Sequence, residues 1–317
     1  MAINADKPHL WKADIAASVD QFNQWFLLFA PKAYRDSRAA ATVHVEEGIR
    51  LTRDLTALTQ DVLKQHPGVL QFLRMSTCPP LARDRLIGLA DASKNLVKVM
   101  EEKKAIPKRM PPAALHENLA RIADTIGRML DVDIFPWIAS KATPTEEERH
   151  RASTIVADRL CGAVSDPIIR NAQEKRQLAL IAEYLEKRGY RQHAHPAGSP
   201  LEQMEPGTFA FRMIVVGGGQ LKVNIPTDVV IQRKTPKPGR LPILIEAKSA
   251  GDFTNTNKRR KEEAAKIAQL QQAYGQDVEY ILFLCGYFHS GYLGYEAAEG
   301  IDWIWEHRIS DLDQLGI

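Results

Sequence analysis

Three residues in and next to two apolar segments have the types and spacing for metal-assisted chemistry. Leu241–Ile245 is an apolar run typical of a buried strand, and it continues into Glu246, Ala247 and Lys248. Since alternate residues of a strand point to the same face, Glu246 and Lys248 project together. Asp228 is the one acidic residue in the preceding apolar stretch. Charged groups are costly to bury alone, so these side chains need a partner or a function.

The turn between the two apolar segments sets how these residues face each other. If the turn is centred near Lys237, Asp228 lies opposite Glu246 in an antiparallel pair. Facing carboxylates repel each other, and a divalent cation removes that repulsion. Hard oxygen ligands suit Mg²⁺. We therefore expect a Mg²⁺ site held by Asp228 and Glu246, with the carbonyl oxygen of Ala247 as a further ligand.

Such a site is suited to the hydrolysis of a phosphodiester bond. A bound Mg²⁺ polarises the scissile phosphate and acidifies a water molecule. The ammonium group of Lys248 is then able to orient or deprotonate that water and to offset charge in the transition state. The residue pattern alone leaves one alternative open, a solvated ion pair at the edge of a sheet.

Positive charge is concentrated around the candidate site. Residues 232–261 contain nine Lys or Arg and two acidic residues, a net charge of +7, against +3 for the whole chain. A protein that binds the phosphate backbone of DNA requires such a concentration. Lys258, Arg259 and Arg260 fall at an expected helix start, where cations oppose the helix dipole and a DNA phosphate would reconcile the two. The alternative is a solvated helix start.

The second half of the chain alternates between element types. Asp166 and Pro167 are typical of a helix start, and Gly189 of its end. Strands are expected over residues 208–216, 221–232, 241–248, 278–285 and 301–305, and a helix over 257–274. Residues 286–295 are expected to form a loop. The predicted order is helix, three strands, helix, strand.

The first half of the chain has the periodicity of helices. Apolar residues of the segment 15–29 recur at three- and four-residue steps, and similar stretches cover 43–63, 81–100, 115–130 and 145–164. No strand is expected before about residue 200. We therefore predict an all-helical region at residues 1–165, for DNA recognition or dimer contacts, and a catalytic α/β domain at 166–317. Arg74, Arg83 and Arg85 flank a Pro–Pro break in the helical region and are candidate DNA contacts, with surface ion pairing as the equal alternative.

Composition limits the class of protein. The chain has 317 residues, of which 44% are hydrophobic and 26% charged, a globular profile. Its net charge of only +3 excludes a polybasic protein. No apolar run reaches the roughly 18 residues of a membrane span, and the first residues lack the apolar stretch of a signal peptide. Three widely separated cysteines argue against a disulfide framework or a Cys-x-x-Cys zinc site. A cytoplasmic protein is expected.

Asp228, Glu246 and Lys248 resemble the PD-(D/E)XK motif of type II restriction endonucleases. Here the proline and the acid are separated, as Pro226-Thr227-Asp228, which leaves the role of Pro226 in question. Longer segments, Arg74–Leu86, Glu246–Arg259 and Gly291–Glu296, resemble the XamI restriction endonuclease family, and this resemblance covers most of the chain.

The resemblance implies an α/β (α+β) PD-(D/E)XK nuclease core, a mixed sheet flanked by helices, in a Mg²⁺-dependent homodimer. It implies a sequence-specific cut in double-stranded DNA at a GTCGAC-type palindrome, which leaves 5′-phosphate ends, and a cognate DNA methyltransferase in the same host. A helix before such a core often supplies an extra carboxylate, for which Glu183 and Glu174 are candidates; a plain surface acid is the alternative for each. Two other functions remain open, a structure-specific nuclease of repair or recombination and a DNA-binding protein without catalysis.

Overall fold

The computed structural model describes residues 2–196, 199–254 and 256–317, apart from the side chains of residues 163–166 and 256–260. The described chain divides into two compact units, which we call the sheet unit (residues 1–29 and 169–317) and the helical unit (residues 30–168). Two long helices, α1 (Pro8–Leu51) and α8 (Glu146–Lys187), each contribute residues to both units. No helix among the described residues is long and apolar enough to span a membrane.

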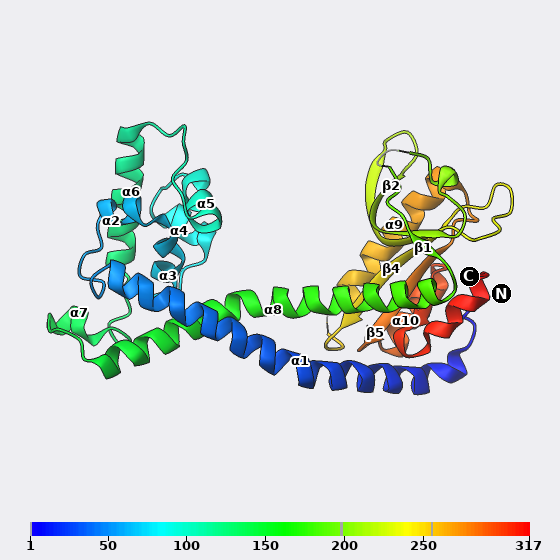
Figure 1. Ribbon diagram of the computed structural model, residues 1–317, viewed down its shortest axis with the longest axis horizontal. Helices are drawn as coiled ribbons and strands as arrows, with labels where there is room; N and C mark the ends of the chain where they lie inside the picture. Colours follow the sequence, from blue (N-terminus) through cyan, green and yellow to red (C-terminus); the bar gives the residue numbers. More distant parts are fainter. Residues whose placement is uncertain (1, 197–198, 255) are drawn as a thin grey trace. The chain divides into compact units, whose positions relative to one another are not determined.

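The sheet unit is built on a six-stranded mixed sheet with strand order β1-β2-β3-β4-β5-β6 (Figure 1). Strands β2, β3 and β4 are joined in antiparallel pairs, whereas β1 runs parallel to β2 and β4, β5 and β6 run parallel to one another. The strands are β1 (Arg191–Gln192), β2 (Thr208–Gly217), β3 (Val223–Ile231), β4 (Ile243–Ala250), β5 (Tyr280–Gly286) and β6 (Asp302–Trp305). The mixed sheet and the predicted order of the main strands are confirmed.

Both faces of this sheet are buried, so its strands bury alternate residues in two different cores. On one face, residues such as Leu244 and Leu282 pack with α9 (Thr256–Tyr274), α10 (Ser290–Ala298) and the start of α1. The opposite face packs against the last turns of α8 and against η3 (Glu306–Leu315). Glu246 and Lys248 alternate with the apolar residues of β4 and belong to the face that α9 covers.

The helical unit has its own apolar core, formed by the second part of α1, the first part of α8 and the segments between them. Val45, Leu63, Leu96 and Ile122 are fully buried there. The intervening segments are α2 (Gln60–Gln65), η1 (Pro67–Val69), α3 (Leu70–Met75), α4 (Arg83–Leu89), α5 (Lys94–Lys103), α6 (Pro112–Gly127) and α7 (Pro136–Ser140). A further short 3₁₀ helix, η2 (Leu201–Gln203), lies in the sheet unit.

Several sequence expectations about elements are wrong. α8 runs through Pro167 without interruption, because one proline removes a single backbone hydrogen bond while apolar residues on both sides of it are buried. Strand β1 precedes residue 200, and α10 occupies part of the segment expected to be a loop. His289 caps α10, since its side chain accepts a hydrogen bond from the backbone N–H of Tyr292.

The N-terminal residues join the sheet unit rather than the helical region in which the sequence prediction had placed them. The side-chain amide of Asn4 donates to the carbonyl oxygen of Trp303 at 2.8 Å. The rings of Trp11 and Trp303 pack edge to face at 5.5 Å. The backbone N–H of Gly286 donates to the hydroxyl of Ser18 at 2.8 Å. The first turns of α1 are therefore part of the fold that holds β5 and β6.

Candidate functional site

The register of β3 and β4 brings Asp228 and Glu246 to opposite positions, as predicted from a turn centred near Lys237. The β3–β4 ladder ends with the pair Val229 and Ile245, and the same register extended by one residue places Asp228 opposite Glu246. One Asp228 oxygen, Oδ2, accepts a hydrogen bond from the backbone N–H of Ala247 at 2.8 Å. This bond ties the Asp228 carboxylate to the strand that carries the other two residues.

Glu246 and Lys248 lie in the interior between β4 and α9. Glu246 is 6% exposed, and the side chain of Lys248 is 16% exposed. The preceding residues of β4 are fully buried and fix the strand at the centre of the sheet. Both charged groups are thus held on a rigid element and largely out of water.

Two charged residues of α9 complete an alternating chain of charges at this place. Lys266 Nζ lies 2.5 Å from Glu246 Oε1. Lys248 Nζ lies 3.1 Å from the same Glu246 oxygen and 2.7 Å from Glu263 Oε1. Buried charges are tolerated when they are paired, and in this order each cation lies next to a carboxylate.

Burial and nearby charges alter the pKa values of the strand residues. Burial raises the pKa of Asp228 to about 6, with the Glu246 charge as the next contribution, while the N–H of Ala247 and the Lys248 charge act in the opposite direction. Burial alone would lower the pKa of Lys248, but the carboxylates of Glu246 and Glu263 outweigh it, so this pKa is raised. The site therefore favours a cation near Asp228 and a protonated Lys248.

The oxygen atoms present fit a hard divalent cation. Oε2 of Glu246 is buried and has no hydrogen-bond partner among the described residues. Asp228 offers a second carboxylate, and Ala247 lies between the two positions with its carbonyl on the same strand. Within the described residues no group of three or more His, Cys, Asp or Glu is arranged to hold a metal. Asp228 and Glu246 are the carboxylates that would hold such a cation, with Ala247 contributing a backbone oxygen.

The two candidate additional acids lie at different places on α8. Glu174 is close enough to Asp228 to raise its pKa, and it forms an ion pair with Arg212 of β2 at 2.7 Å. Glu183 is exposed and pairs with Lys187 one turn further along the same helix, at 2.6 Å. The structure thus brings Glu174 near the strand residues and leaves Glu183 as a surface acid.

Sequence reasoning missed Glu263, Lys266 and Gln177. The side-chain amide of Gln177, on α8, donates to the carbonyl oxygens of Lys248 and Phe283 at 3.4 Å each and so joins β4 to β5 from the opposite face. A signal for Glu263 was available. It shares a helical stripe with the buried Ile267 and Leu270, and an acid in an apolar stripe points to a buried partner.

The structure describes only some of the predicted DNA contacts. The side chains of Lys258, Arg259 and Arg260 lie outside the described residues. Arg85 is exposed on α4. Arg83 pairs with Glu101 and Glu102 at 3.0 Å each. In this structure Arg83 therefore takes part in ion pairs, the alternative to a DNA contact.

Arg74 corrects a sequence expectation. Its side chain is 8% exposed, donates to both carboxylate oxygens of Glu101 and also donates to the carbonyl oxygen of Leu81. A guanidinium group engaged in this way cannot reach a base. Arg74 of α3 therefore joins α5 through its ion pair with Glu101, a residue 27 positions away in sequence.

We expect Arg74→Met to lower the free energy of unfolding of the helical unit by about 3–5 kcal/mol, because it leaves the buried Glu101 without its main partner. Urea unfolding followed by circular dichroism measures this change. Arg85→Met is the matched control, since an exposed residue of the neighbouring helix should change stability by no more than about 0.5 kcal/mol. Equal effects of the two substitutions would contradict the assigned role of Arg74.

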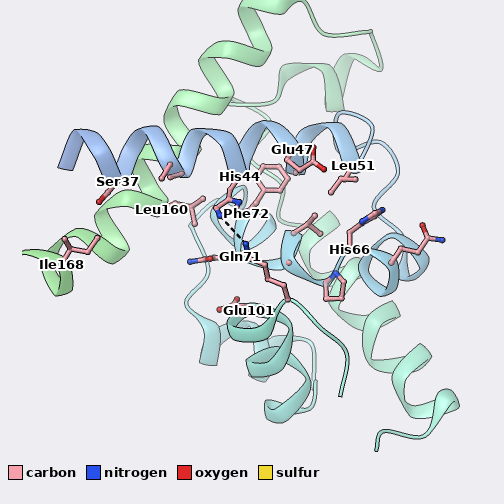
Figure 2. A pocket seen from close by; sticks show the side chains of 18 residues that line it. Ser37, His44, Glu47, Leu51, His66, Gln71, Phe72, Glu101, Leu160 and Ile168 are labelled. Carbon is pink, nitrogen blue, oxygen red and sulfur yellow. Dashed lines mark hydrogen bonds between the residues drawn. The ribbon is translucent and has the colours of Figure 1, made fainter. Parts of the chain in front are cut away.

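The helical unit also contains a pocket of about 530 Å³, shown in Figure 2. Its lining includes His44 of α1, His66, and Phe72 and Glu101 from the short helices. Lys104 Nζ lies 3.5 Å from His44 Nε2 at its edge. Its lining does not include Asp228, Glu246 or Lys248, so this pocket is separate from the candidate catalytic site.

Two comparisons with known proteins point to one family. A family model described as XamI restriction endonuclease matches residues 53–305. The type II restriction enzyme SalI of Streptomyces albus G is 57% identical over 314 residues, which are 99% of this chain and 99% of that protein. Among solved structures, the crystal structure of protein VC1899 from Vibrio cholerae aligns with 80% of this chain at 12% identity and a TM-score of 0.29, a value too low to support any conclusion. This chain covers only 55% of that one.

Proposed function

The chain belongs to the XamI restriction endonuclease family, and from this premise we propose that it cleaves double-stranded DNA at a GTCGAC-type palindrome, with Mg²⁺ as cofactor, leaving 5′-phosphate ends. The observation that carries the proposal is the opposition of Asp228 and Glu246 on paired strands, with Lys248 beside them. An acid on one strand and Glu-x-Lys on the next support assignment of a PD-(D/E)XK core.

The residues of the site divide the work as follows. Asp228 and Glu246 would hold the metal ion, together with the carbonyl oxygen of Ala247. When bound, Mg²⁺ supplies Lewis acidity toward the scissile phosphate and lowers the pKa of a coordinated water. The Lys248 ammonium orients the attacking water and offsets the negative charge that develops on the phosphate oxygens. Glu174 is the candidate for a further acid, since it acts on Asp228 electrostatically.

A palindromic target implies a symmetric enzyme. Because the two DNA strands are related by a twofold axis, a homodimer presents the same site to each strand. The helical unit is the candidate for DNA recognition or dimer contacts. A host that makes such an enzyme must protect its own DNA, and we propose a cognate methyltransferase as the functional partner.

Plasmid cleavage tests the proposal directly. The purified protein is incubated with Mg²⁺ and a plasmid carrying one GTCGAC site, and in parallel with a plasmid in which one base of that site is changed. We expect a single linear product from the first plasmid only, and 5′ ends that accept a kinase label only after phosphatase treatment. A smear from both plasmids would favour the structure-specific or nonspecific nuclease, and binding without cleavage the non-catalytic protein.

The basic start of α9 gives a separate prediction about binding. Replacing Lys258 and Arg259 with Ala should weaken binding to all DNA sequences, because each contributes a phosphate contact and no base contact. The slope of log affinity against log salt should fall by roughly one for each lost contact. Fluorescence anisotropy over a salt series measures this slope. Lys187→Ala, which replaces an exposed lysine at the end of α8, serves as control. An unchanged slope in the double variant would mean that the segment is a solvated helix start and does not contact DNA.

A further inference from the structure

A fully buried carboxylate lies next to the proposed catalytic lysine and has no assigned role. Glu263 of α9 is 0% exposed, and its Oε1 lies 2.7 Å from Lys248 Nζ. A buried carboxylate requires a cationic partner, and Lys248 is the one that the described residues give it. We propose that Glu263 is a positioning residue, which holds the Lys248 ammonium group where it acts on the attacking water; this inference rests on the proposed function.

The position of the ammonium group is fixed from two different elements. Glu246 contacts it from β4 at 3.1 Å, and Glu263 contacts it from α9 at 2.7 Å (Figure 1 shows both elements). A lysine side chain is long and flexible, so one anchor on its own strand leaves its direction open. The second anchor, across the gap between sheet and helix, restricts it to one place.

Glu263 shares the Lys248 ammonium group with Glu246, the proposed metal ligand. Lys248 lies closer to Glu263 than to Glu246, and both Lys248 and Lys266 approach the same Glu246 oxygen, Oε1. Oε2 of Glu246 has no hydrogen-bond partner among the described residues. The arrangement thus gives one oxygen of Glu246 to the lysines and leaves the other to a cation.

A simpler role for Glu263 is that of a counter-ion needed only for folding. The two roles differ in what happens when Lys248 is absent. If Glu263 acts through Lys248, its replacement has no effect on the cleavage rate once Lys248 is gone. A residue that only supports the fold lowers the rate in either background.

The test is a double-mutant cycle of Glu263→Gln and Lys248→Met in the full-length protein, with Glu262→Gln as control. Glu262 is exposed on the same helix, and Glu262→Gln removes the same charge as Glu263→Gln. Single-turnover cleavage of linear DNA carrying GTCGAC is measured with Mg²⁺, DNA affinity is measured by anisotropy without divalent cations, and each variant is melted.

We expect Glu263→Gln to lower the single-turnover rate by about 10–10²-fold, since small misplacements of a reacting group cost that much, while DNA affinity stays unchanged. The same substitution should leave the rate of Lys248→Met unchanged. It should raise the melting temperature of that background, because it removes an unpaired buried charge, and lower it in the wild type. If Glu263→Gln does not fold, Glu263→Asp is used for the same comparison. It keeps the negative charge but moves the carboxylate away from Lys248 by the length of one methylene group.

An equal loss of rate in both backgrounds, or a normal rate for Glu263→Gln, overturns the positioning role. Cleavage by the wild-type protein separates the positioning role of Glu263 from the proposed function on which it rests. A wild type that cleaves while Glu263→Gln cleaves equally fast overturns the inference alone, whereas a wild type that does not cleave overturns the proposed function.

Discussion

Glu246→Ala is expected to bind GTCGAC-containing DNA and to leave it uncut. The substitution removes a carboxylate of the proposed metal site, and the reaction then lacks the charge stabilisation that the metal supplies, so the rate should fall by several orders of magnitude. Binding should persist, because the loss of one negative charge near Lys248 and Lys266 reduces repulsion toward phosphate. Plasmid cleavage and anisotropy on the same preparation measure the two effects.

A companion variant tests the other carboxylate with less disturbance of the strand. Asp228→Asn keeps an oxygen that can accept the hydrogen bond from Ala247 but removes the charge. We expect the same loss of cleavage from it, and from Asp228→Ala. Glu186→Ala, at an exposed position of α8, is the control and should cut normally. A normal cleavage rate in Glu246→Ala would mean that the site is wrongly assigned.

Lys248→Met should lower the single-turnover rate by roughly 10²–10³-fold, the usual cost of removing one positioned donor that stabilises charge in the transition state. The methionine keeps much of the side-chain stem and removes the ammonium group. Calorimetric titration should still detect Mg²⁺ binding, because the proposed ligands are oxygens of Asp228, Glu246 and Ala247. The loss of a nearby positive charge should, if anything, strengthen that binding.

The same substitution separates catalysis from stability. Lys248→Met leaves Glu263 buried without its partner, so the melting temperature should fall as well. The rate must therefore be expressed per folded molecule. A near-normal rate together with a lowered melting temperature would make Lys248 an ion-pair partner only, and its proposed catalytic role would be lost.

The positions of Asp228, Glu246 and Lys248 relative to one another were accessible from sequence because their determinants are local. An apolar run followed by Glu-x-Lys indicates one strand, and the connection over residues 232–242 relates that strand to Asp228 by counting from its centre. The register of β3 and β4 agrees with that count. Nothing beyond the alternation of a strand and the symmetry of a hairpin was needed.

Partners that are distant in sequence were not accessible in the same way. Glu263 pairs with Lys248, a residue of a strand that only the fold brings close to α9. Arg74 likewise pairs with Glu101 of another helix. The periodicity of α1 predicted a helix but could not say which core its first turns would join. Pro167 indicates a helix start by local rules, which do not include the burial of residues on either side of it, and α8 instead runs through it.

The discontinuity of the sheet unit has a consequence for any attempt to exchange parts between related enzymes. In chain order, residues 30–168 form an insertion within the sheet unit, and both junctions fall inside α1 and α8. A fragment that begins at residue 166 would lack Asn4 and Trp11 and leave Trp303 uncovered. An exchange of the inserted segment between related enzymes must therefore join it through both α1 and α8, in phase with the turns of each helix.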